Sequence, residues 1–214
     1  MPGRGRVFIV SAPSGSGKST LVTQLLEKVP DLGFSISYTT RKPRRGERNG
    51  VEYFFVTEAV FDEMLAAEQF VEHARVFDHS YGTARHDLEA TLARGKDVLL
   101  DIDTEGASQV KVQIVDAVSI FIMPPSYEAL HERLDKRQLD NKETIQKRLR
   151  WASEVEVHRF KNYDYIVVNE DLTRSVELMC SIIWAERCRT QRMTEQVEQI
   201  IKTFGGIRID NQHR

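Results

Sequence analysis

The sequence predicts an α/β protein with a parallel central sheet flanked by helices, into which a mixed lobe and a helical lid are inserted. Four short apolar runs, Val7–Val10, Val98–Leu100, Ser119–Met123 and Tyr165–Val168, are typical of central parallel strands, which are buried on both faces. A loop of small residues joins the first run directly to a helical pattern. Between residues 34 and 83 short alternating strands and polar loops indicate an inserted lobe.

The first half of the chain supplies both helical and extended patterns. Leu21, Leu25 and Val29 recur at helical spacing, so a helix is expected over 18–29. Phe34–Tyr38 alternates polar and apolar residues like a half-buried strand. The other elements expected here are a strand at Tyr53–Val56 and helices at Glu58–Ala67 and His86–Arg94, on either side of a short segment around Val71–Thr83.

The second half continues the alternation. Asp97–Asp101 is expected to be a buried strand that ends before Gly106, and Val118–Met123 another strand. The region Ser126–Phe160 is helical in pattern and unusually basic. Residues 173–201 are expected to form a long terminal helix with one break.

Composition excludes several classes of protein. The 214 residues are 41% apolar and 29% charged, as in an ordinary globular domain, and the net charge of −2 does not suit a general nucleic-acid binder. No apolar run reaches the 18 residues that a membrane span needs, and the start of the chain lacks the apolar region of a signal peptide. We therefore expect neither nucleic-acid nor membrane partners.

The two cysteines, Cys180 and Cys188, fall eight residues apart in one helical pattern. A helix would separate them by about 12 Å along its axis, too far for a disulfide. Two reduced core thiols of this kind are expected in a cytoplasmic protein.

The loop APSGSGKST, which begins at Ala12, matches the phosphate-binding loop GxxxxGK[ST], although Ala12 stands where the first glycine usually does. Gly15 and Gly17 still allow backbone N–H groups to converge on an anion, and the following helix adds its positive end. We expect Lys18 to contact the outer phosphates and Ser19 to ligate Mg²⁺. The residues predicted to bind the nucleoside triphosphate here are Ala12, Pro13, Ser14, Gly15, Ser16, Gly17, Lys18, Ser19 and Thr20.

A second ligand for Mg²⁺ is expected at Asp101, which ends an apolar run. Alone this is a weak signal, because many strands end in Asp as part of a turn. Beside a phosphate-binding loop, the same carboxylate is in the right place to hold the metal shell.

Residues 41–48 carry five basic side chains in eight positions, which would normally indicate a solvated loop or a nucleic-acid patch. Here Pro, Gly and Glu are interleaved with them, and strand-like residues flank the segment, which favours a structured anion pocket. Arg41 and Arg44, three residues apart, can both fork onto one phosphate.

This segment resembles the guanylate kinases, whose nucleoside-monophosphate lobe carries a TTR-P-R-GE-NG-Y pattern. Seven blocks in the same order, between Val7 and Arg187, carry the resemblance: SAPSGSGKST, SYTTRKPRRGERNGVEYFFV, FVEHARVF, YGT, LLDIDTEGA, FIMPPS and IVVNED. The resemblance implies a P-loop enzyme of purine nucleotide metabolism that uses Mg²⁺ and reversibly transfers a phosphoryl group from ATP to GMP.

The resemblance also implies the acceptor site. Residues matching Arg41, Arg44, Tyr53 and Tyr81 hold the GMP phosphate, residues matching Ser37, Glu72, Thr83 and Asp103 read the guanine, and Glu47 orients an arginine. The chemistry of Glu72 is reasonable by itself, because one carboxylate can accept both N1–H and the exocyclic amine of guanine, whereas adenine presents a lone pair at N1. That mismatch costs on the order of 2–4 kcal/mol. Without the resemblance, Glu72 would be interpreted as a surface carboxylate at a helix end.

The basic helical region resembles the lid of the same family. Arg133, Arg137 and Arg148 match positions that reach the phosphates during transfer, and with Lys18 and Arg41 they form the predicted catalytic set. The GRG sequence usual at this point is missing from residues 136–138, so the lid hinge is expected to be stiffer. Asn169 matches a residue near the adenine, although a strand-end Asn can equally form a turn.

The predicted organisation is a P-loop core of residues 1–37, 84–125 and 161–214, a GMP-binding lobe of residues 38–83 and a lid of residues 126–160. Two alternatives remain open: a non-catalytic guanylate-kinase-like module that binds phosphopeptides, and a kinase for AMP or dTMP. The intact loop disfavours the first, and the segment after residue 38 disfavours the second. Mixed polar and apolar residues over 191–214 are compatible with a homo-oligomer without requiring one.

Overall fold

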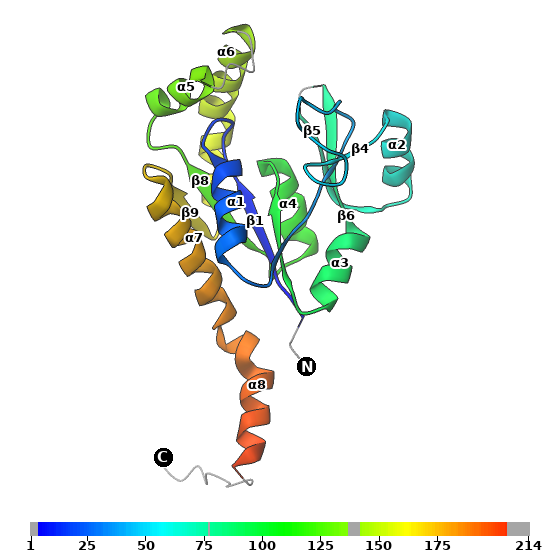
Figure 1. Ribbon diagram of the computed structural model, residues 1–214, viewed down its shortest axis with the longest axis vertical. Coiled ribbons are helices and arrows are strands. Elements are labelled where there is room, and N and C mark those ends of the chain that lie inside the picture. The colour runs from blue at the N-terminus through cyan, green and yellow to red at the C-terminus, as the bar shows by residue number, and fades with distance from the viewer. Residues whose placement is uncertain (1–3, 77, 137–141, 205–214) are drawn as a thin grey trace.

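Residues 4–76, 78–136 and 142–204 are described by the computed structural model of this chain. Two separate sheets organise it, a five-stranded sheet and a four-stranded one. Figure 1 shows the first at the centre, the second to one side, two helices above and a long terminal helix that extends away below.

The central sheet is entirely parallel, with the strand order β2-β7-β1-β8-β9. Its strands are β1 (Val7–Ser11), β2 (Leu32–Phe34), β7 (Asp97–Asp101), β8 (Val118–Met123) and β9 (Tyr165–Val168). The three inner strands are almost fully buried because helices cover both faces, which explains their continuous apolar sequence. All strands point the same way, so their carboxyl ends share one edge of the sheet.

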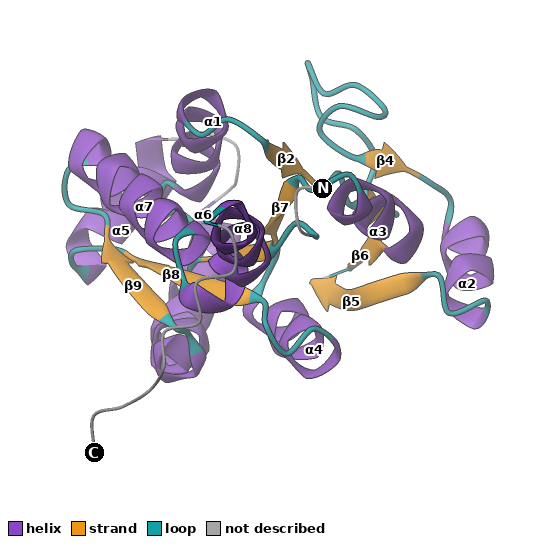
Figure 2. Ribbon diagram, turned by 90° about the horizontal axis from the view of Figure 1, so that it is seen from below, coloured by secondary structure: helices purple, strands orange, loops and turns teal. Residues whose placement is uncertain are grey.

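Helices pack on both faces of this sheet (Figure 2). One cluster of buried residues joins β1 and β8 to α1 (Lys18–Lys28) and α7 (Leu172–Arg187). The other joins β1 and β7 to α3 (Arg85–Ala93) and α4 (Thr104–Gln113). Burial on the two faces therefore fixes the strand ends that carry the polar residues.

The smaller sheet is mixed, with the order β4-β3-β6-β5. It consists of β3 (Tyr38–Thr39), β4 (Phe54–Phe55), β5 (Phe70–Val76) and β6 (His79–Ala84), with helix α2 (Glu58–Ala66) at its side. Stacked rings of Tyr38 on Phe54 and of Phe61 on Phe70 give this sheet its own apolar centre.

The basic region is helical as predicted. It contains α5 (Tyr127–Lys136), α6 (Lys142–Trp151), a π-helical turn (Ala152–Glu156) and a 3₁₀ helix (Val157–Asn162). Leu130, Leu134, Ile145, Leu149 and Ala152 form a small core between the two α-helices. This pair is therefore a unit with its own packing.

Two expectations for individual elements are wrong, and one helix was not predicted. The chain does not form one strand over Phe34–Tyr38, because it leaves the central sheet after Phe34 and joins the second sheet at Tyr38. Helix α4, which begins directly after Asp103 and contains Gly106, is the helix that was not predicted. The last strand, β9, lies at the edge of the sheet, with Ile166 and Val168 about half exposed.

The terminal helix is broken once, as predicted, between α7 and α8 (Thr190–Thr203). Both cysteines are free thiols, but only Cys180 packs against the core, whereas Cys188 at the end of α7 is exposed. The expectation of two core thiols is thus wrong for Cys188, because the helix ends there. Among the described residues no helix is both long and apolar enough to cross a membrane.

Candidate active site

The phosphate-binding loop connects β1 to α1 at the carboxyl edge of the central sheet. Gly15 and Gly17 have φ angles of 94° and 88°, in the left-handed region that favours glycine. The carbonyl of Ser16 is held from behind by the side chains of Asn169, at 2.7 Å, and Arg133, at 3.3 Å. These two bonds therefore fix the loop at the Ser16 carbonyl.

Helix α5 packs directly on this loop. A side chain at Gly15 would lie 2.8 Å from Cγ of Leu134, and one at Gly17 would lie 2.7 Å from Nδ2 of Asn169. Arg133 also donates to the Asn169 carbonyl at 2.9 Å. Gly15 and Gly17 thus allow α5 and Asn169 to pack closely on the loop, in addition to adopting its backbone conformation. Asn169 itself is buried and supports the loop.

Lys18 and Asp101 meet at the mouth of the loop. The Lys18 ammonium lies 2.6 Å from the Asp101 carboxylate and donates to the Ile102 carbonyl at 3.0 Å. Both side chains remain about one-fifth exposed, so the pair can open to a ligand. An anion bound to the loop would compete with Asp101 for Lys18.

A second basic centre lies on the four-stranded sheet side. Glu47 accepts two parallel hydrogen bonds of 2.9 Å from Arg41, and a third from the N–H of Arg44. The pairing raises the pKa of Arg41 and lowers that of Glu47. The Arg41 guanidinium lies 5.3 Å from the ring centre of Tyr53, which touches Tyr81 edge to face. Burial raises the pKa of Tyr53 to about 12, so its hydroxyl stays a hydrogen-bond donor.

Glu72 lies in β5 with 3% of its surface exposed, which excludes the alternative of a surface carboxylate. Its Oε1 accepts a 2.6 Å hydrogen bond from the Thr83 hydroxyl. Burial raises the pKa of Glu72 to about 7, partly offset by the bond from Thr83, with the Asp103 charge adding to the rise. A carboxyl group kept in such surroundings without a cation is a candidate for ligand recognition.

Asp103 caps α4 and thereby shapes the pocket around Glu72. Its carboxylate accepts the N–H groups of Glu105 at 3.0 Å and Gly106 at 2.7 Å. A side chain at Gly106 would lie only 2.3 Å from Oε2 of Glu72, so the first turn of α4 borders the carboxylate. Ser37 is buried directly before β3, where its carbonyl accepts a hydrogen bond from the Phe54 N–H.

Two further residues of this region were not predicted from the sequence. Glu156, in the π-helical turn, accepts the N–H of Ser14 and has a raised pKa because it is buried, with Lys18 among the charges acting on it. Its Oε2 and the Tyr163 hydroxyl are both buried without a hydrogen-bond partner in the described part of the chain. Glu156 falls in a helical pattern and Tyr163 lies between that pattern and β9, so nothing in their spacing singles them out.

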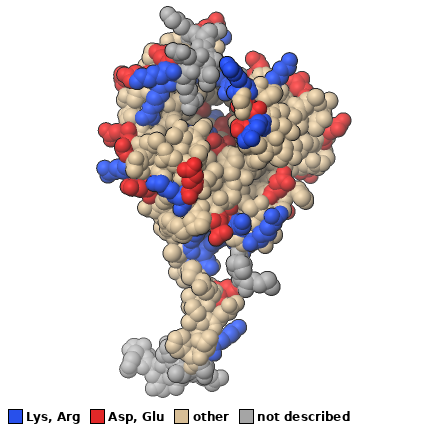
Figure 3. Space-filling view, in the orientation of Figure 1, with Lys and Arg blue, Asp and Glu red and all other residues tan. Residues whose placement is uncertain are grey.

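The other predicted residues differ in how closely they approach this centre. Arg44, Ser19 and Thr20 are exposed, and Arg148 is half-buried on α6. Arg137 lies outside the described residues, and so does most of the segment where the GRG sequence is missing. Figure 3 shows the surface hollowed between the α5–α6 side and the four-stranded sheet, with acidic and basic side chains around the opening.

The oxygens at the loop suit Mg²⁺, a hard cation that retains waters and binds through one or two carboxylates or hydroxyls together with substrate phosphates. Asp101 supplies a carboxylate that is about one-fifth exposed, and Ser19 an exposed hydroxyl. Within the described ranges no cluster of three or more His, Cys, Asp or Glu could hold a metal by itself. The donor set thus fits a metal that arrives with a nucleotide.

Comparisons with known proteins agree with this arrangement. The guanylate kinase family model matches residues 4–186. The chain is similar to a guanylate kinase of Koribacter versatilis, with 52% identity over 91% of this chain and 84% of the relative, and to one of Syntrophotalea carbinolica, with 47% identity over 94% and 95%. The crystal structure of guanylate kinase from Anaplasma phagocytophilum superposes with a TM-score of 0.74 at 34% identity, covering 88% of this chain and 89% of that one.

The family model spans both sheets, the loop and the α5–α6 pair, and the curated relatives match over nearly the whole chain. The expected α/β P-loop fold and the enzymatic character are therefore confirmed. This chain belongs to the guanylate kinase family.

Proposed function

We propose that this enzyme transfers the terminal phosphoryl group of ATP to GMP, reversibly and with Mg²⁺. The observation that carries the proposal is Glu72, a buried carboxylate without a basic partner among the described residues, beside the N-terminus of α4. Guanine offers two adjacent N–H donors to such a group, and adenine does not. The base-reading pocket would consist of Glu72 with Ser37, Thr83 and Asp103.

ATP would bind at the loop Ala12–Thr20, with its outer phosphates against the backbone N–H groups and Lys18. Binding would replace the Lys18–Asp101 ion pair and free the Asp101 carboxylate, which with Ser19 would hold Mg²⁺. The metal would supply charge neutralisation at the phosphates. Asn169, which already holds the loop from behind, would lie toward the adenine side.

The GMP phosphate would bind at Arg41, Arg44, Tyr53 and Tyr81. Glu47 holds the Arg41 guanidinium in a fixed plane, so Arg41 is preorganised for a phosphate. Transfer needs no covalent protein intermediate, because positioned cations stabilise the charge that spreads over the phosphoryl oxygens. Lys18 and Arg41 would provide that charge, with Arg133, Arg137 and Arg148 from the lid.

The chain would accordingly work as three parts: a P-loop core (residues 1–37, 84–125 and 161–214), a GMP-binding lobe (38–83) and a lid (126–160). The free thiols and the nature of the substrates suit the cytoplasm, and neither nucleic acid nor a membrane is required for the reaction.

A coupled assay of ADP release with GMP, AMP, dTMP and CMP in parallel tests the proposal. We expect turnover with GMP to exceed that with the other monophosphates by orders of magnitude, and Lys18→Ala to abolish it in a folded protein. Turnover of AMP or dTMP equal to that of GMP would contradict the base assignment. Normal turnover by Lys18→Ala would contradict the assignment of the loop.

The alternative of a phosphopeptide-binding module makes the opposite prediction. It would bind a phosphopeptide through Arg41 and Arg44 and release no ADP in the same assay. The preserved Lys18–Asp101 pair at the loop favours the enzyme, because peptide binding has no use for it.

A further inference from the structure

A cavity of about 660 Å³ lies at the amino ends of β1, β8 and β9, the edge of the central sheet opposite to the candidate active site. Its walls also include the ends of α4 and α7 and the start of α8. Figure 1 shows the junction of α7 and α8 at the lower end of the body, away from α5 and α6. The volume is in the range of small-molecule sites, and no step of the proposed reaction uses it.

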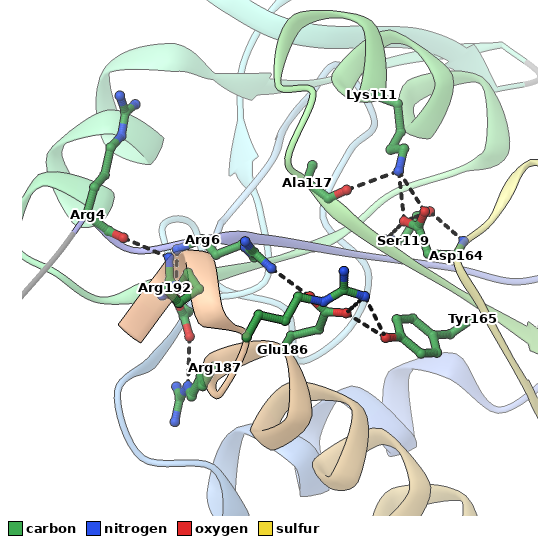
Figure 4. A network of polar contacts seen from close by, with 12 residues as sticks. Arg4, Arg6, Lys111, Ala117, Ser119, Asp164, Tyr165, Glu186, Arg187 and Arg192 are labelled. Atoms are coloured by element: carbon green, nitrogen blue, oxygen red, sulfur yellow. Dashed lines mark hydrogen bonds and ion pairs between the residues drawn. The ribbon is translucent and has the colours of Figure 1, made fainter. Parts of the chain in front are cut away.

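The side chains at the floor of this cavity converge from the starts of β1 and β9 and from the two terminal helices (Figure 4). Arg6 and Arg189 lie 2.6 and 2.8 Å from the carboxylate of Glu186, whose side chain is 2% exposed. Arginine stays ionised in proteins, so these three groups carry one positive charge in excess. Arg6 is itself nine-tenths buried, and its Nε has no hydrogen-bond partner among the described residues.

A second pair of arginines repeats the pattern behind this floor. Arg187 and Arg192 lie 2.8 and 3.1 Å from the carboxylate of Asp97, which is 3% exposed, and Arg192 also lines the cavity. The other ion pair on the wall, Lys111 with Asp164 at 2.7 Å, is balanced. Four guanidinium groups thus share two buried carboxylates, which leaves an excess of two positive charges.

The start of α8 adds backbone donors to this charge. No described side chain caps the helix, and the carbonyl of Arg189 accepts the N–H groups of Arg192 and Met193. The N–H groups of Thr190 and Gln191 lie ahead of these, where a helix offers no internal partner. Anions are stabilised at such a helix end, which here borders a cavity lined by arginine.

We propose that this cavity binds a small-molecule phosphate monoester, with its phosphate group at Arg6, Arg189 and the first turn of α8. A phosphate dianion matches the excess of two positive charges, and guanidinium groups form paired hydrogen bonds with its oxygens. The cavity is much larger than one phosphate group. Val115, Val118 and the exposed carboxylate of Asp116 line it as well, which suits an organic part that carries hydroxyl groups.

The backbone amide signals of Thr190 and Gln191 in the nitrogen-15 NMR spectrum of the whole protein test the proposal. The active site is first saturated with a non-transferring bisubstrate analogue, so that added phosphate cannot report on the phosphate-binding loop. Titration with ribose 5-phosphate should then shift both signals saturably, and at lower concentration than inorganic phosphate does. Sodium chloride at the same ionic strength should give no saturable shift, because screening alone has no stoichiometry.

Three results of this titration would overturn the proposal. They are no saturable shift with ribose 5-phosphate, an equal response to chloride, and binding of inorganic phosphate as tight as that of the monoester. The last result would mean that the cavity holds a free anion and has no place for an organic part.

Two variants locate the phosphate group. Arg189→Gln removes one cation from a half-exposed side chain and should weaken binding by about tenfold or more, whereas Arg94→Gln, at an exposed arginine outside the cavity, should not. Gln191→Glu places a carboxylate at the first turn of α8 and should abolish the shifts.

Folding of Gln191→Glu is expected to be intact, because an acidic residue stabilises the start of a helix, and its melting temperature checks this. Gln199→Glu adds the same charge about two turns further along α8 and should bind like the wild type. Undiminished binding by Gln191→Glu, or an equal loss in Gln199→Glu, would contradict the assignment of the phosphate group to this turn.

Discussion

Glu72 combines two requirements that conflict in the free enzyme. Burial favours its protonated form and raises the pKa to about 7, whereas two guanine donors require the ionised form. Since kcat/KM reports the ionisation of the free enzyme, its value for GMP should fall by up to about tenfold per pH unit below pH 7. The comparison is a pH–rate profile of wild type and Glu72→Gln, in which this acidic limb should be absent. A limb that persists in Glu72→Gln would assign it to another group.

Because of the same conflict, a variant that loses the Glu72 carboxylate is expected to be more stable and less active. The folded pKa of Glu72 lies above the unfolded value of 4.5, so the folded protein loses stability as pH rises from about 4.5 to 7, and the loss remains at higher pH. Replacing the carboxyl by Gln removes it, at most on the order of 3 kcal/mol. Melting temperatures should show Glu72→Gln more stable than wild type at pH 8 but not at pH 4.5. Equal gains at both pH values would mean that ionisation is not the cause.

Glu156 places a second carboxylate against the loop at which we propose that ATP binds. The N–H of Ser14 holds it there, and its buried Oε2 has no partner within the described residues. Triphosphate bound at the loop would be repelled by this charge, so Glu156→Gln should tighten ATP binding by roughly three- to tenfold. GMP binding should change little.

Calorimetric titration of each nucleotide separately measures both effects. Glu154→Gln is the matched control, because Glu154 lies two residues earlier and is exposed beside Arg150, away from the loop. Weaker ATP binding in Glu156→Gln would show that the carboxylate supports the loop instead of opposing the phosphates.

At the scale of the elements, the first turn of α4 makes room for the Glu72 carboxylate, which we propose binds the base. In an ordinary helix, Gly→Ala is stabilising by about 1 kcal/mol. At position 106 the added carbon would lie 2.3 Å from Oε2 of Glu72, so the carboxylate must move. Gly106→Ala should therefore weaken GMP binding by tenfold or more and leave ATP binding intact.

Calorimetry with each nucleotide again provides the measurement. Ser108→Ala, in the same helix but exposed and away from Glu72, is the control for helix propensity. Equal GMP affinities in Gly106→Ala and wild type would show that the pocket is wide enough for an alanine, and that Gly106 has no part in recognition.

The elements that could be predicted from the sequence are those whose local pattern agrees with their tertiary surroundings. The buried strands β1, β7 and β8 are apolar throughout, and α1 has a clear apolar stripe. Helix α4 was not predicted because a glycine usually marks a turn. The reason for Gly106 inside this helix is its close approach to Glu72, which lies 34 residues away in the chain. The passage from β2 to β3 was missed because alternation identifies a strand but not the sheet it joins.

The site shows the same division. Lys18, Arg41 and Glu47 stand in dense motifs, and the structure brings Arg41 and Glu47 together as predicted. The roles of Arg133 and Asn169 in holding the Ser16 carbonyl could not be predicted, because they depend on segments 117 and 153 residues distant in the chain. Glu156 has no motif at all, and only the packing of the π-helical turn on the loop places it in the site.

At the scale of the whole molecule, the two proposed nucleotide sites lie on parts of the chain that pack separately. Helix α5 already contacts the loop through Leu134 and Arg133, whereas Arg41 and Tyr81 belong to the four-stranded sheet. Transfer requires water to be excluded between them, since water would otherwise accept the phosphoryl group. Closure is therefore expected mainly as an approach of the GMP-binding lobe, residues 38–83, to the core and lid.

Small-angle scattering with a non-transferring bisubstrate analogue measures this closure. We expect the radius to fall when both sites are filled, to fall less with GMP alone, and to change least with an ATP analogue alone, because the lid helix α5 already lies on the loop. An unchanged radius at saturation with the bisubstrate analogue would contradict closure. A full decrease with the ATP analogue alone would instead assign the motion to the lid.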